Sequence, residues 1–391
     1  MRGEEIAAYV VSISICSLIR PQNGCPFYRY REPYLGDLMK PTDVLRLYED
    51  GYREFKGLSL AGADFSGKIL VGVDLSECDL SGANFSRSFL TKANFEGANL
   101  SRADLTFAKM SDAHFAYATL TKARLRGAFC VRADMSHAQI SGAQLAHINC
   151  RAAQLNGANL SGANLVGANL RNAHAAGANF SWANLSGVRL IGAAIAQTRF
   201  TGVKFDKAFL NGLNFSGMDL NGVSFREARL KGASFRDTDL TAANFKGASL
   251  HNSDFHNANL AGASLTAAHL HRAKFFCADL RRVIGDFVDW SEAELTGAIL
   301  SEEMSAEFRN VHSPALNSHG VYMLPIATAH GEIAGAEISG AEISAREVAI
   351  RTMEARGTVT KETVTKGTAA SRVMNIYSMR PTVYGSPYRN I

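Results

Sequence analysis

Proline is missing from the middle of this 391-residue sequence, because all eight prolines lie at or before Pro41 or at or after Pro314. A proline removes a backbone N–H donor and is poorly tolerated inside a β-ladder. The long proline-free stretch is therefore compatible with a continuous ladder of backbone hydrogen bonds. No apolar run is long enough to cross a bilayer: residues 6–19 are the best candidate and are too short. They follow Glu4 and Glu5 instead of basic residues, so we expect no signal peptide. The run predicts a packed helix or strand, with a secretion address or membrane-surface segment as the alternatives.

Cysteines and catalytic motifs are also scarce. The six cysteines lack C-x-x-C spacing, which indicates neither a zinc site nor a disulfide framework. We therefore expect a reducing compartment, the cytoplasm of the producing cell, with export to a host cell left open. The sequence has no GxxxxGK[ST], HExxH or GxSxG motif. We expect no enzyme activity, no metal and no cofactor.

Acidic residues are absent between Asp134 and Asp206. Asn often occupies the positions of this stretch that could have been Asp, as at Asn149 and Asn169. Residues 51–300 carry 26 Lys and Arg against 20 Asp and Glu. The middle of the chain is therefore basic, which favours partners with anionic groups.

What the sequence has in abundance is a five-residue repeat that runs from Phe55 to Leu300 without insertion or deletion. Leu, Phe, Ile, Met, Cys or Trp occupies every fifth position except Ala175 and Gly285. Ala is the usual residue two positions earlier, and Asp or Asn commonly lies between. Neither a helix nor a strand has a period of five, so we expect short extended segments joined by turns. Such short repeats bury their apolar faces only when successive coils stack.

Stretches such as Ala103-Asp104-Leu105-Thr106-Phe107 and Ala163-Asn164-Leu165-Val166-Gly167 resemble the A(D/N)LXX motif of the pentapeptide-repeat family. No single subgroup of the family is indicated. The resemblance implies an all-β solenoid, a right-handed quadrilateral β-helix with four pentapeptides per coil. The repeats would make about 12 coils, with small N- and C-terminal flanking segments.

Four pentapeptides per coil place residues 20 apart on top of one another. In one part of the repeat this arrangement predicts two columns of Phe and two of Leu inside the coils. The predicted core comprises Phe205, Phe215, Phe225, Phe235, Phe245, Phe255, Leu210, Leu220 and Leu230.

The flanks predict five regions. Residues 1–50 form an N-terminal segment that ends in a capping helix over 42–51, with an N-cap at its start and Gly51 at its end. Residues 51–300 form the uninterrupted repeat and 301–332 a linker. Residues 333–357 predict a short pentapeptide coil out of phase with the main repeat, a helix from Ala345, or both. Residues 358–391 predict a strand-like or disordered tail.

The candidate binding site is a column of side chains that directly follow the buried centres. Its basic or titratable members are Arg151, Arg171, Lys231, His251 and His271. Stacked like charges repel, and an anionic partner would relieve the repulsion. The alternative is that the long side chains splay into water, where the repulsion is screened. His256 and His269 lie near the column in sequence; we expect these histidines to face solvent and not to bind a metal.

Three classes of function fit a stiff repeat without a reaction centre. The first is a non-catalytic protein-interaction scaffold, such as a bacterial effector or adaptor, whose partner has an acidic surface. The second is a DNA mimic that binds topoisomerases, as some members of the family do, but such mimics need an acidic surface. The third is a structural fibre or assembly component, with self-association through the C-terminal region. We expect the first class, and we do not expect nucleic acid as a partner because no aromatic residues alternate with the basic column.

Overall fold

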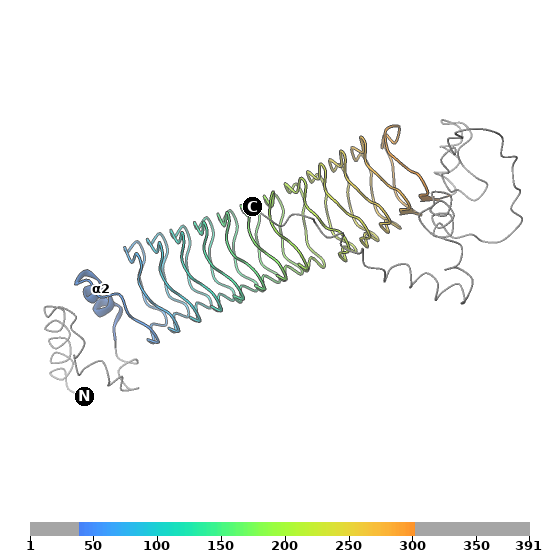
Figure 1. Ribbon diagram of the computed structural model, residues 1–391. Helices are drawn as coiled ribbons and strands as arrows, with labels where there is room; N and C mark the ends of the chain where they lie inside the picture. The colour runs from blue at the N-terminus through green and yellow to red at the C-terminus, as the bar shows by residue number, and fades with distance from the viewer. Residues whose placement is uncertain (1–38, 302–391) are drawn as a thin grey trace, which may run out of the picture. The chain divides into compact units, whose positions relative to one another are not determined.

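The computed structural model describes residues 39–301 of the chain, and Figure 1 shows their path. They belong to two compact units, residues 39–209 (unit 1) and residues 210–301 (unit 2). The predictions for residues 1–38, including the apolar run at 6–19, lie outside the described residues. So do the linker beyond Ser301, the out-of-phase coil or helix at 333–357 and the tail at 358–391.

Within each unit, every short wall segment pairs in parallel with the segment 20 residues further along the chain. Asn99 pairs with Thr119 in unit 1, and Asp239 pairs with Asn259 in unit 2. In the ladder, the N–H of Leu100 donates to the carbonyl oxygen of Thr119 at 2.7 Å. Near the end of unit 2, β1 (Asp279–Leu280) pairs in parallel with β2 (Ile299–Leu300). The 20-residue spacing corresponds to four pentapeptides per coil, while the right-handed sense of winding stays a prediction.

Each corner between two walls is a tight turn, and the turn explains the repeat motif. At one corner the N–H of Ala98 donates to the carbonyl oxygen of Phe95 at 3.0 Å, and Gly97 has a φ of 65°. A positive φ at the third residue is the mark of a type II turn. Where Asp or Asn precedes a centre, its side chain helps to form the corner: the N–H of Ser66 donates to Oδ1 of Asp64 at 2.9 Å. The A(D/N)LXX pattern thus encodes a small inward residue, a side-chain acceptor for the turn and a large inward residue.

The centres of the repeats form the core of each unit. All nine side chains predicted to lie inside are 0% exposed. The phenylalanines of unit 2 stack from coil to coil: the ring centroids of Phe215 and Phe235 are 5.1 Å apart, and those of Phe235 and Phe255 are 4.9 Å apart. Near-parallel stacks of this kind add to the free energy gained from burial alone.

The thiols of the repeat are buried or half-buried. Cys130, Cys150 and Cys277 are free, and Cys78, Cys130 and Cys150 are buried. A hydrogen bond with Cys150, together with burial, raises the pKa of the Cys130 thiol well above its ordinary value. Cys130 is therefore a poor nucleophile and packs as a small apolar residue.

The helix before the first coil is α2 (Pro41–Glu49). Its N-cap is Lys40, so the prediction that the helix begins at Thr42 with its own N-cap there was wrong. Pro41 explains the difference, because proline suits the first helical position, where no N–H is needed. Val44 and Leu47 are buried, and the Tyr48 hydroxyl donates to the carbonyl oxygen of Val71 at 3.0 Å. The helix thus contacts the first coils of unit 1. Within residues 39–301 no helix has the length and apolar character needed to cross a membrane.

Candidate functional site

The residues predicted to bind a partner include two on one wall of unit 1, which we call the 69–209 wall. The wall consists of the outward residues at every twentieth position and of the corner column that follows them. The outward residues are Ile69, Phe89, Lys109, Phe129, Asn149, Asn169, Arg189 and Phe209, and the corner residues are Val71, Thr91, Ser111, Val131, Arg151, Arg171 and Ile191. Neither column contains an acidic residue.

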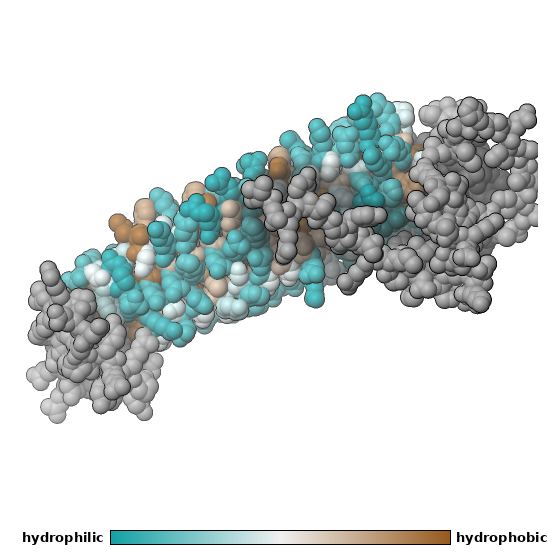
Figure 2. All heavy atoms as spheres, viewed as in Figure 1, coloured by the Kyte–Doolittle hydropathy of each residue, from teal (hydrophilic) through white to brown (hydrophobic). Residues whose placement is uncertain are grey.

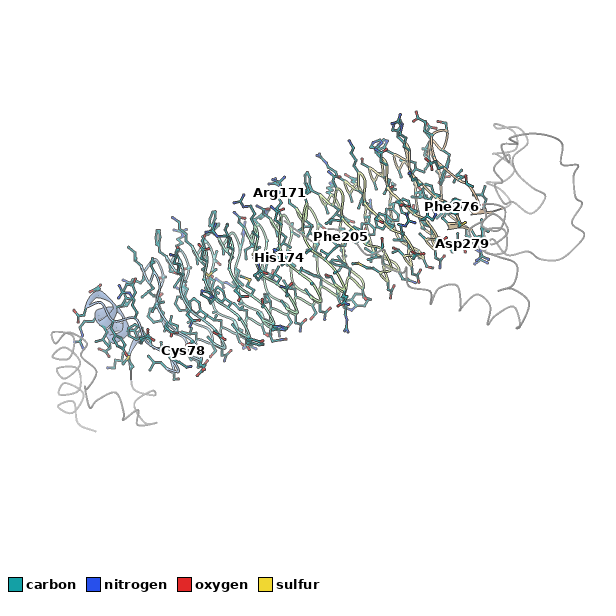
Figure 3. All side chains as sticks on the ribbon, in the orientation of Figure 1. Cys78, Arg171, His174, Phe205, Phe276 and Asp279 are labelled. Atoms are coloured by element: carbon teal, nitrogen blue, oxygen red, sulfur yellow. The ribbon has the colours of Figure 1, made fainter. Side chains whose placement is uncertain are left out.

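Arg151 and Arg171 occupy the same corner in adjacent coils, and both are exposed. Figure 3 shows Arg171 at the outer margin of its coil. Within residues 39–301, neither arginine forms an ion pair. Elsewhere in unit 1, cations 20 residues from an acid do pair: Arg124 lies 2.6 Å from Asp104 and Arg132 lies 2.7 Å from Asp112. No acidic side chain of the described residues therefore pairs with the charge of Arg151 or Arg171.

The other half of the wall is apolar, which the sequence analysis missed. Ile69 is 64% exposed, Phe89 is 38% exposed and Phe129 is 46% exposed. Lys109 lies between the two phenylalanines, with its Nζ 4.3 Å from the ring centroid of Phe89. Figure 2 shows hydrophobic residues, in brown, at the surface over the first coils beyond α2. The sequence carried a signal, because Ile and Phe occupy positions where the repeat usually has Asp or Asn.

Unit 2 brings together the remaining predicted residues, Lys231, His251 and His271. The ring of His251 lies 6.0 Å from that of His271 and 6.0 Å from that of His269. Burial lowers the pKa of His251 below its ordinary value, and the charges of His269, His271 and Lys231 lower it further. His271 Nδ1 lies against a carboxylate oxygen of Glu292. His251 is therefore mostly neutral near neutral pH, and His271 already has an acidic partner. Both findings weaken the histidines as binding groups relative to Arg151 and Arg171.

The histidines do not build a metal site in the described part of the chain. No three His, Cys, Asp or Glu side chains within residues 39–301 converge so as to hold a metal ion. His256 instead packs against Phe276, with ring centroids 4.4 Å apart. Burial, followed by the charge of Arg236, lowers the pKa of His256.

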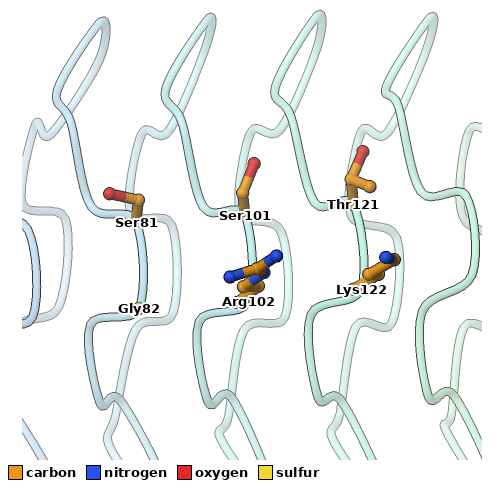
Figure 4. A pocket seen from close by; sticks show the side chains of 6 residues that line it. All are labelled: Ser81, Gly82, Ser101, Arg102, Thr121 and Lys122. Carbon is orange, nitrogen blue, oxygen red and sulfur yellow. The ribbon is translucent and has the colours of Figure 1, made fainter.

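A shallow depression of about 570 Å³ lies at a different corner of unit 1, as Figure 4 shows. Its lining consists of Ser81, Gly82, Ser101, Arg102, Thr121 and Lys122. These residues include hydroxyl groups and two cations but no carboxylate or imidazole that could deprotonate a hydroxyl. The depression can attract an anion, but its lining does not provide the groups of a hydrolytic site.

Comparison with known proteins supports the repeat assignment. The family model described as pentapeptide repeats matches residues 59–97, 78–115, 113–149, 153–192 and 253–284, and the model described as a pentapeptide repeat region matches residues 192–265. No protein with a curated description matches the chain.

Solved structures similar to this chain include two pentapeptide repeat proteins and one fluoroquinolone resistance protein. HetL, involved in heterocyst differentiation regulation in the cyanobacterium Nostoc sp. strain PCC 7120, is 28% identical, with a TM-score of 0.32 and coverage of 68% of this chain and 98% of HetL. A pentapeptide repeat protein from the Arabidopsis thaliana thylakoid lumen is 23% identical, with a TM-score of 0.24. The match covers 29% of this chain and 82% of the Arabidopsis chain. QnrB1, a plasmid-mediated fluoroquinolone resistance protein, is 17% identical, with a TM-score of 0.23 and coverage of 67% and 100%.

The family assignment depends on the two family models and on the 20-residue coil. Together the models extend over residues 59–149 and 153–284, more than half of the chain. The parallel pairing of residues 20 apart in each unit is the structural counterpart of that sequence match. The chain belongs to the pentapeptide repeat family.

Proposed function

We propose that the protein is a non-catalytic interaction scaffold and that a protein partner with an acidic surface binds along the 69–209 wall. The observation that carries the proposal is the pair Arg151 and Arg171, stacked in adjacent coils with no acidic residue in either column of the wall. Coils about 4.8 Å apart hold the two charges close together, which is unfavourable in the free protein. Anionic groups of a partner remove that repulsion and replace it with attraction.

The backbone of the wall supports rapid and specific binding. Its wall segments are bonded to both neighbouring coils, as when Asn169 donates to Ile148 and Leu170 donates to Arg189. The arginines are therefore fixed at their Cα atoms before a partner arrives, and less conformational entropy is lost on binding.

The proposal also has a biological part. We propose a role as a bacterial effector or adaptor that acts in the cytoplasm of the producing cell or, after export, in a host cell. The right-handed winding of the coils belongs to the same proposal and rests on the family resemblance. Self-association through the C-terminal region is an alternative use of the same chain.

The test compares three full-length proteins as immobilised baits for bacterial and eukaryotic lysates. These are the wild type, Arg151→Glu with Arg171→Glu, and Arg102→Glu with Lys122→Glu as a control with the same change in charge at another corner. Charge contacts at a rim act mainly on the association rate. We expect slower capture and a weaker salt dependence only for the wall variant. Equal capture rates for all three proteins at low and high salt would contradict the proposal.

A further inference from the structure

The shallow depression of unit 1 contains two cations at the same corner of adjacent coils. Arg102 and Lys122 line it, and both are exposed. Figure 4 shows them beside a second row formed by Ser81, Ser101 and Thr121. Within residues 39–301 neither cation forms an ion pair. Like charges one coil apart repel, so a ligand that neutralises both gains from the loss of repulsion as well as from attraction.

The depression also contains a backbone donor that has no acceptor. At the corner before it, the N–H of Ser101 donates to Oδ1 of Asn99 at 3.1 Å. One coil further along, Thr119 occupies the position of Asn99, and its short side chain makes no such bond. Within residues 39–301 the N–H of Thr121 therefore has no hydrogen-bond partner. An exposed N–H beside two cations is a donor suited to an anion.

The carboxylates on the two flanking walls are already engaged. Oδ1 of Asp79 accepts hydrogen bonds from the N–H of Ser81 at 3.1 Å and from the side chain of Asn99 at 3.0 Å. Asp104 pairs with Arg124 at 2.6 Å. The lining of the depression itself has no acidic residue. Its two positive charges are therefore not neutralised within the described residues.

The charge and the arrangement of these donors fit a phosphate group. A phosphate ester carries a charge of about −1.5 to −2 near neutral pH and has strong acceptor oxygens. Coils about 4.8 Å apart hold Arg102 and Lys122 on neighbouring segments, so both can reach oxygens of one tetrahedral group. A carboxylate has a single charge and would leave one of the two cations without a counter-charge.

The depression has room for more than the phosphate group. Its volume is about 570 Å³, within the range of roughly 300–1,000 Å³ that is usual for small-molecule sites. At Gly82, the corner residue one coil before Arg102, a Cβ atom would have no other atom within 4 Å. The space beside Arg102 is therefore open to the organic part of a phosphate monoester.

We propose that the depression binds the phosphate group of a small molecule, either free phosphate or a phosphate monoester. Arg102 and Lys122 neutralise its charge, and Thr121 donates its backbone N–H and its hydroxyl. The site is separate from the 69–209 wall and does not depend on the proposed function. It adds a small-molecule ligand to a chain for which we propose a protein partner.

The first experiment is equilibrium dialysis of full-length protein against radiolabelled inorganic phosphate and, in a second arm, phenyl phosphate, both at low ionic strength. Arg102→Gln with Lys122→Gln should weaken binding at least about tenfold. The control, Arg199→Gln with Lys204→Gln, removes the same charge from exposed positions further along the two flanking walls and should change affinity less than about twofold. Equal loss in both pairs, or no binding of either anion to the wild type, overturns the inference.

The second experiment removes the backbone donor. Thr121 is the second residue of a type II turn, because the N–H of Ala123 donates to the carbonyl oxygen of Leu120 at 3.0 Å and Lys122 has a φ of 57°. Proline suits that position, so Thr121→Pro removes the N–H while the turn is kept.

Thr121→Pro should weaken phosphate binding about tenfold, whereas Thr121→Ala, which keeps the N–H, should weaken it only about threefold. Thr91→Pro is the matched control, because the N–H of Thr91 also has no partner within residues 39–301 and lies at another corner. Equal affinity of Thr121→Pro and Thr121→Ala overturns the inference. Thermal unfolding shows whether the coils are intact, and the glutamine pair decides the test if the proline variant does not fold.

The two probes separate the sources of the phosphate group. Tighter binding of phenyl phosphate than of inorganic phosphate indicates a monoester, and equal affinity indicates free phosphate. Benzoate, with one negative charge, should bind at least about tenfold more weakly than phenyl phosphate. Equal affinity for benzoate and phenyl phosphate overturns the inference. Capture of a protein partner by the 69–209 wall is a separate measurement, so either proposal can fail while the other holds.

Discussion

The ring of Phe107 lies over Gly127, the residue at the same corner of the next coil. A Cβ atom built on Gly127 would overlap the Phe107 ring, and a Cβ on Gly157 would lie 2.6 Å from Nδ1 of His137. Gly127 also has a φ of 65°, so two independent causes favour glycine there. The overlap with the Phe107 ring makes the residue that is tolerated at position 127 depend on the residue in the neighbouring coil.

Gly127→Ala should therefore destabilise unit 1 more than Gly162→Ala does. Both glycines have a positive φ, but nothing lies within 4 Å of a Cβ on Gly162. The backbone conformation alone costs about 1–2 kcal/mol for alanine. Overlap with Phe107 should add about 0.5–1.5 kcal/mol at Gly127, because the half-exposed ring has to leave its position. Urea unfolding of the two full-length variants measures the difference.

A double-variant cycle isolates the ring as the cause. With Phe107→Ala in the background, Gly127→Ala and Gly162→Ala should become nearly equal in their effect on the free energy of unfolding. If Gly127→Ala keeps its extra cost in that background, the overlap with the ring is not its source.

The core and the coil could be predicted from the sequence because both follow from the period. The large apolar side chain of a five-residue repeat has to point inward at every fifth position. Four repeats per coil then place Phe215 and Phe235 in the same column of the core. The N-cap of α2 lies two residues before the predicted one. Pro41 suits the first position of a helix, and this preference outweighs the capping by the Thr42 side chain that we predicted.

The apolar half of the wall was missed for a different reason. The repeat pattern predicts which side chains are buried. Ile69, Phe89 and Phe129 are exposed, and they differ from the Asp or Asn that the pattern usually has at those positions. Likewise, the pairing of His271 with Glu292 depends on two corner side chains in adjacent coils, and the five-residue pattern does not fix their conformation. The column remains a prediction as a binding site. Within residues 39–301 its histidine His271 has an acidic neighbour, whereas Arg151 and Arg171 form no ion pair.

Leu165 tests the inward assignment of the repeat centres, since its side chain is only 1% exposed. Leu165→Asp should destabilise unit 1 by about 4 kcal/mol or more, because a carboxylate would be buried among apolar side chains. Leu165→Met should cost less than about 1.5 kcal/mol, because volume and polarity are kept. Circular dichroism melts of both variants provide the measurement. Wild-type melting of Leu165→Asp is the result that this assignment does not allow.

His251 should titrate below its ordinary value of 6.5. Burial and the charges of His269, His271 and Lys231 lower its pKa, so the unfolded chain binds this proton more readily than the folded one. The contribution of His251 to stability is therefore present above 6.5 and is lost as the pH falls through the folded pKa. An NMR titration should show this depressed value, and Lys231→Ala should raise it. No change in that variant would remove Lys231 as a cause.

The basic surface predicts no effect on type II topoisomerases. Residues 51–300 carry 26 Lys and Arg against 20 Asp and Glu, so the repeat is opposite in sign to duplex DNA. Such a surface is repelled by the cationic surface on which these enzymes bind DNA. A gyrase supercoiling assay, with and without a topoisomerase poison, should give the same result whether or not the protein is added. Protection or inhibition at low micromolar protein would favour the DNA-mimic class over the scaffold.

Arg151→Glu should stabilise the protein while it weakens partner binding. In the wild type Arg151 faces a like charge on Arg171 one coil away, whereas Asp112 and Arg132, in the adjacent corner column, show that opposite charges 20 residues apart pair at 2.7 Å. The substitution replaces repulsion with an exposed ion pair, which is worth about 0.2–1 kcal/mol. Chemical unfolding at low salt should show the gain, and high salt should reduce it. A matched control, Arg151→Gln, should show only the part of the gain in unfolding free energy that comes from the lost repulsion. If the glutamate variant is no more stable than the glutamine variant, the two corner side chains do not interact, and the repulsion that supports an anionic partner on this wall is absent.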